Sequence, residues 1–126
     1  MRAKFLSSEG EYLEAQLEIK GQTLHVMDEF DGKQFEPGDE IDVEIQPGLI
    51  GESESWESIF SSNPKREKKL EHQSGWKYRA YGIVTSVNPV IVDCGIISVE
   101  APISTNDKRI IGSSIAFSID RLDARN

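Results

Sequence analysis

The chain has 126 residues, which is room for one domain with a buried core. Hydrophobic residues make up 37% of it and charged residues 29%, with a formal net charge of −8, a composition that excludes fibrous and disordered proteins. No apolar run approaches the roughly 20 residues of a membrane span, so we expect no transmembrane segment.

The start of the chain is basic but turns polar after Leu6, so we expect no signal peptide. The sequence holds a single cysteine, which cannot form an internal disulfide. A lone thiol fits a reducing compartment, and we therefore expect a cytoplasmic location.

The first predicted element is a β-hairpin over residues 11–30. Apolar and polar residues alternate along its first strand, the period of two expected of a half-buried strand. Gly21-Gln22 predicts a type II′ turn, which would pair Leu17 with Val26. The side chains predicted to share the core face are Leu13, Leu17, Ile19, Leu24 and Val26.

A repeated pattern follows this hairpin. Residues 38–45 and 112–119 both read Gly-x-x-Ile-x-apolar-x-Ile, and each places three apolar side chains on one face of a strand. The chain is therefore either two copies of a hairpin–loop–strand unit or a set of strands that enter through glycine turns. The second interpretation is the simpler one, and we favour it.

The segment 46–75 is predicted to be a helical and loop insert. A short helix would gather three apolar residues, spaced at i, i+3 and i+4, on one stripe. These candidate partner-binding residues are Trp56, Ile59 and Phe60. Asn63-Pro64 predicts the start of a second, mostly charged helix over about residues 64–72, with a loop as the alternative.

A second hairpin is predicted over residues 78–97, with Asn88-Pro89 as its turn signal. The alternation places Val92 on the same face as Ile83 and puts Val84 on the opposite face. It also assigns Tyr81 to the core.

Five or six strands with one helical segment predict an all-β fold, a small single-domain β-barrel over residues 1–126. By element order the nearest common architecture is an OB-like barrel, with its short helical insert between the third and fourth strands. A six-stranded barrel of two swapped halves is the alternative.

The sequence carries no recognisable catalytic or metal-binding motif. Cys94 is the only thiol, and its apolar strand neighbours favour a buried structural cysteine over a nucleophile. His25 is expected opposite Glu18, where a surface ion pair is favoured over a metal site because only the distant His72 could be a second histidine ligand. We therefore expect no catalytic residue, no metal and no cofactor.

The stretch WKYRAY at residues 76–81 favours a different function. Aromatic side chains beside basic ones are what single-stranded nucleic-acid binding uses. The candidate residues for this alternative are Trp76, Lys77, Tyr78 and Arg79. The negative net charge opposes it, because an acidic surface repels nucleic acid and anionic membranes.

The acidity is concentrated in residues 1–50, which hold four basic against twelve acidic residues. It attracts basic partners, although it also simply keeps a small protein soluble. We expect a non-catalytic module that binds a protein partner, one version being an acidic inhibitor or immunity-type protein. The aromatic cluster of the insert would form the interface, unless it is buried as a cap on the barrel. A nucleic-acid-binding barrel is the second hypothesis, and a small-molecule enzyme the third.

Overall fold

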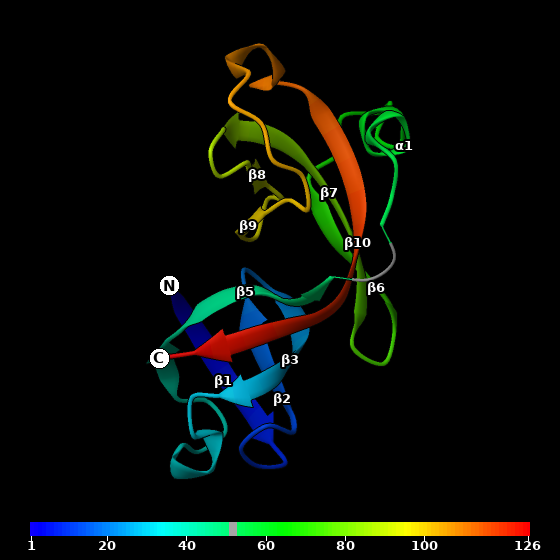
Figure 1. The fold of residues 1–126 in the computed structure, drawn as a ribbon. Helices are drawn as coiled ribbons and strands as arrows, with labels where there is room; N and C mark the ends of the chain where they lie inside the picture. The colour runs from blue at the N-terminus through cyan, green and yellow to red at the C-terminus, as the bar shows by residue number, and fades with distance from the viewer. Residues whose placement is uncertain (51–52) are drawn as a thin grey trace.

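The computed structural model describes residues 1–50 and 53–126, which form ten strands, one α-helix and two short 3-10 helices (Figure 1). The strands are β1 (Arg2–Ser8), β2 (Glu14–Ile19), β3 (Gln22–Glu29), β4 (Glu40–Asp42), β5 (Glu44–Ile50), β6 (Lys69–Ser74), β7 (Lys77–Ser86), β8 (Ile91–Asp93), β9 (Ser98–Glu100) and β10 (Ser114–Arg125). The helices are η1 (Gly32–Gln34), α1 (Trp56–Ser61) and η2 (Lys108–Ile110). No helix in the described residues is long and apolar enough to cross a membrane.

The strands form one curled sheet in the order β4-β1-β2-β3-β10-β7-β8-β9, with β5 pairing to β10 and β6 to β7. The long strand β10 joins the two groups of strands in Figure 1, because its first half pairs with β7 and its end runs parallel to β3. The prediction of a mostly β, small single domain is confirmed, with the sheet curled into a half-barrel.

The same strand arrangement occurs twice. The orders β4-β1-β2-β3 and β10-β7-β8-β9 are both that of a Greek key, in which the fourth strand returns beside the first. The glycine before each fourth strand also makes the same hydrogen bond to the first strand of its unit. Gly38 N donates to Phe5 O at 2.8 Å, and Gly112 N donates to Val84 O at 2.8 Å. Two copies of one unit therefore explain the repeated sequence pattern better than unrelated glycine turns do.

The first hairpin has the predicted core face, but its turn lies one residue earlier. Leu17 pairs with Leu24, so the turn residues are Lys20 and Gly21. Their φ angles of 50° and 81° are those of a type I′ turn, which matches the twist of the strands better than the predicted turn. The partner of each residue on β2 is two positions away from the predicted one, so the same side chains still lie on the core face. The exception is Leu13, which precedes β2 and is exposed.

The predicted faces of the second hairpin were wrong. Val92 lies opposite Val84 instead of joining Ile83, because a register shift between Val84 and Ser86 moves the pairing by one residue. The buried face of β7 therefore carries Tyr78, Ala80 and Val84. Tyr81, which was assigned to the core, lies on the other face and is half-buried.

The segment 46–75 is a helical insert only in part, since strands occupy both of its ends and its positions 51–52 lie outside the described residues. Its helix α1 follows the fifth strand and not the third. The second helix predicted over 64–72 was wrong, because Arg66 has a φ of 55°, which a helix does not allow, and β6 begins at Lys69.

Candidate functional site

The helix α1 carries a stacked aromatic pair, Trp56 and Phe60, and one fully buried side chain, Ile59. The side chain of Ile59 is 1% exposed and belongs to the core, and the helix packs on β10. Trp56 is 45% exposed, and its ring stacks on that of Phe60 with centroids 4.7 Å apart. The structure thus brings the three predicted residues together but separates their roles. Ile59 is buried, Phe60 is partly buried and packs against the core, and Trp56 is the exposed member of the stack.

The chain is fixed to the sheet just before α1. The Glu54 carboxylate accepts hydrogen bonds from Arg79 Nη1 at 2.7 Å and from Ser118 N at 2.9 Å. Both charged side chains are largely shielded from water, which strengthens such a pair. The helix itself begins at a Ser55 cap, whose side chain accepts from Ser58 N at 3.1 Å.

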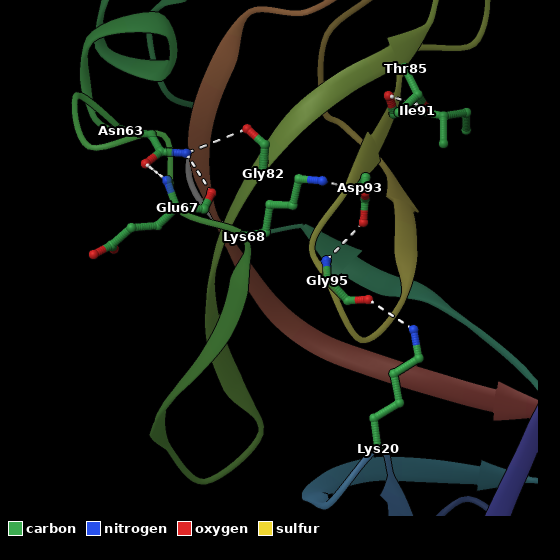
Figure 2. Close-up of polar contacts among 9 residues, drawn as sticks. All are labelled: Lys20, Asn63, Glu67, Lys68, Gly82, Thr85, Ile91, Asp93 and Gly95. Atoms are coloured by element: carbon green, nitrogen blue, oxygen red, sulfur yellow. Dashed lines mark hydrogen bonds and ion pairs between the residues drawn. The ribbon is translucent and has the colours of Figure 1, made fainter.

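The chain is fixed again just after α1, by the buried side chain of Asn63. Its Nδ2 lies 2.9 Å from Glu67 O and 3.4 Å from Gly82 O (Figure 2). It also lies 3.2 Å from Ile115 O. Its Oδ1 accepts from Glu67 N at 2.9 Å. Asn63, predicted as a helix cap, instead ties the loop after α1 to β7 and β10. A helix held at both ends has less conformational entropy to lose on binding.

The residues predicted for nucleic-acid stacking do not share one exposed face. Tyr78 has no exposed surface, and its hydroxyl accepts from His25 N at 2.8 Å. Arg79 is held by the carboxylate that precedes α1, and Trp76 is half-buried. Of the four, Lys77 alone is exposed.

The two histidines meet, although 46 residues lie between them in the sequence. The rings of His25 and His72 stack with centroids 4.6 Å apart, which joins β3 to β6. His25 Nδ1 lies 2.9 Å from Glu14 Oε1, so its partner is not the predicted Glu18. Among the residues that the structure describes, no three His, Cys, Asp or Glu side chains gather in a way that could hold a metal ion.

A hollow of about 690 Å³ lies between the β2–β3 turn and the β8–β9 turn. The charged side chains around it are engaged, because Lys20 donates to Gly95 O at 3.1 Å and Asp93 lies 3.0 Å from Lys68 Nζ (Figure 2). Acid–base catalysis needs a titratable side chain, such as a carboxylate, an imidazole or an amine, that can reach a substrate proton. Paired in this way, Lys20 and Asp93 are poorly placed for that role.

Cys94 is buried, as predicted. Burial, helped by the nearby Asp93 carboxylate, raises the pKa of its thiol to about 12. Because the thiolate is the reactive form, we expect a thiol reagent at pH 8 to label the native protein far more slowly than the unfolded one. Mass spectrometry of timed samples measures both rates, and equal rates would contradict the buried assignment.

No relative supplies a function for this fold. Comparison with known proteins finds no matching family model, no similar curated protein and no similar solved structure. The inference about function therefore rests on the Trp56–Phe60 stack, of which Trp56 is exposed, and on the charge of the chain.

Proposed function

We propose that the protein is a cytoplasmic, non-catalytic module that binds a basic protein partner through the Trp56–Phe60 pair. The observation that carries the proposal is the exposed ring of Trp56, stacked on the partly buried Phe60, on a helix whose ends are both fixed. Tryptophan in a preorganised setting is typical of the few residues that supply most of the binding energy at protein interfaces.

The charge of the chain supports a basic partner. The net charge is −8, and the exposed Glu57 lies next to Trp56 in the sequence. An acidic surface speeds the approach of a basic partner and discriminates against acidic ones. An acidic inhibitor that covers a basic enzyme is one concrete form of such a module.

Replacing Trp56 by alanine tests this role, with Ile111→Ala as a matched control because both side chains are 45% exposed. We expect Trp56→Ala to lower the free energy of unfolding by about 1 kcal/mol or less, because the anchor Ile59 remains. The same change should weaken binding to the partner at least about 30-fold, as hot-spot truncations do.

The partner is first isolated from lysate of the source cells by its binding to immobilised wild-type protein. Calorimetry then measures the unfolding of each variant and its binding to that partner. Ile111→Ala should leave both the melting temperature and the Kd close to those of the wild type. A Kd unchanged by Trp56→Ala would contradict the proposed role of the pair.

A further inference from the structure

The tip of the β6–β7 hairpin lies against β3, although in the described part of the chain β6 pairs as a strand with β7 alone (Figure 1). Side chains make the contact with β3. Gln22 Nε2 donates to Leu70 O at 2.7 Å. The rings of His25 and His72 stack with centroids 4.6 Å apart and an angle of 15° between their planes. The contact therefore depends on side chains that change charge with pH, because histidine takes up a proton in water near about pH 6.5.

The hydrogen-bond partners of the two rings determine which nitrogens carry hydrogen when both are neutral. His72 Nε2 lies 2.7 Å from Gly75 O, and a carbonyl can only accept, so Nε2 is the donor. His25 Nδ1 lies 2.9 Å from Glu14 Oε1, and an ionised carboxylate also only accepts, so Nδ1 is the donor. A further proton therefore binds to Nε2 of His25 or to Nδ1 of His72.

One carboxylate balances charge at this stack. Among the residues that the structure describes, Glu14 alone places a carboxylate oxygen within salt-bridge distance of either ring. It can offset the charge of one imidazolium, but it cannot offset the charges of two. The other charged or titratable groups on the surrounding strands are Glu18 on β2, the Glu29–Arg125 pair of β3 and β10, the Lys69–Glu71 pair on β6, Tyr78 on β7 and the Arg121–Asp123 pair on β10.

We propose that the His25–His72 stack is a pH switch, which accepts one proton and opens when a second is bound. The first charge is balanced by Glu14, which lies in the same hairpin as His25 and stays beside it when the stack opens. Two imidazoliums stacked face to face at this distance repel each other, so the second proton favours the separated rings. The tip of the β6–β7 hairpin then leaves β3.

One backbone amide reports on the opening. His25 N donates to the Tyr78 hydroxyl at 2.8 Å, and the ring of His72 contacts both residues. When that ring leaves, water reaches this hydrogen bond. The amides of Leu24 and Val26 point toward β2 instead, because successive residues of an antiparallel strand alternate in direction. They are therefore internal controls, whose exchange does not depend on the stack.

Amide hydrogen exchange of the full chain at about pH 7.5 and about pH 5 measures the opening, with each rate compared with that of an unfolded chain at the same pH. We expect the protection of the His25 amide to fall at least about tenfold at the lower pH, while that of Leu24 and Val26 stays within about twofold. His72→Phe and His25→Phe each keep a ring but remove one of the two charges. In both variants the protection of the amide at position 25 should be independent of pH.

Salt gives a second measurement on the wild type, which needs no variant. Raising the concentration of NaCl from about 0.05 M to about 0.5 M should reduce the loss of protection at the lower pH, because salt screens the repulsion between the two rings. Trp56→Ala should respond to pH as the wild type does, since α1 is held by Glu54 and Asn63 and not by the stack.

Three results would overturn the proposal. The first is a His25 amide that is equally protected at both pH values in the wild type. The second is a pH dependence that persists in either phenylalanine variant, because a single imidazolium would then be enough to open the contact. The third is an equal loss of protection at Leu24 and Val26, which would mean that the whole β2–β3 hairpin unfolds in acid.

Discussion

Replacing Tyr78 by alanine is expected to lower the free energy of unfolding by about 3–5 kcal/mol, as aromatic-to-alanine changes in cores do. The side chain has no exposed surface, and its ring lies 5.1 Å from that of His72. Its hydroxyl accepts a hydrogen bond from His25 N, and burial raises the pKa of that hydroxyl. The substitution therefore removes packing and a hydrogen bond where β3, β6 and β7 meet.

The variant Tyr78→Phe separates these two contributions. It keeps the ring but leaves the N–H of His25 without its acceptor, which costs about 1–3 kcal/mol when the group stays buried. Urea unfolding of the three proteins measures both losses. Equal losses for the two variants would show that the hydrogen bond and not the ring supplies the stability.

Asn63→Asp is expected to lower the free energy of unfolding by about 3–5 kcal/mol at pH 7, because it buries a charge without a partner. The amide nitrogen is replaced by a carboxylate oxygen that faces the carbonyls of Glu67, Gly82 and Ile115. An ionised carboxylate has no hydrogen to donate to them.

The loss should depend on pH in a defined direction. The surrounding carbonyls favour the protonated acid in the folded protein, so the pKa of the new carboxyl is raised above its unfolded value of about 3.9. The loss is then largest at neutral pH and diminishes as the pH falls through the raised pKa. Unfolding curves from pH 4 to 8 measure it, with Asn63→Ala as the uncharged control. A loss independent of pH would contradict this account of the site.

Local patterns in the sequence predicted the parts of the fold that local forces determine. The alternation from Ala15 to Ile19 gave the correct core face, because a strand buried on one side leaves that period in the sequence. The turn was placed one residue late because a positive φ at Lys20 is uncommon for a residue other than glycine. The faces of β7 and β8 were wrong because the register shift lies between Val84 and Ser86, where no glycine marks it in the sequence.

The sequence predicted which residues form the candidate site, but it did not predict how far each one is buried or what it contacts. The spacing of Trp56, Ile59 and Phe60 predicted one helical stripe. Ile59 is buried in the core and Phe60 packs against it in part, but Trp56 stays 45% exposed at the start of a six-residue helix. The contact between His25 and His72 joins two strands that are far apart in the sequence, so no local pattern predicts it.

Site-specific photo-cross-linking at position 56 tests the central claim, that α1 is a protein interface, most directly. Trp56 is replaced by the photoreactive amino acid p-benzoylphenylalanine, and the source cells are irradiated. Tyr12, which is 62% exposed and lies in another part of the fold, is the control position. We expect position 56 to cross-link to one dominant protein of basic composition. Position 12 should not cross-link to that protein. The same diffuse set of cross-links from both positions would contradict it.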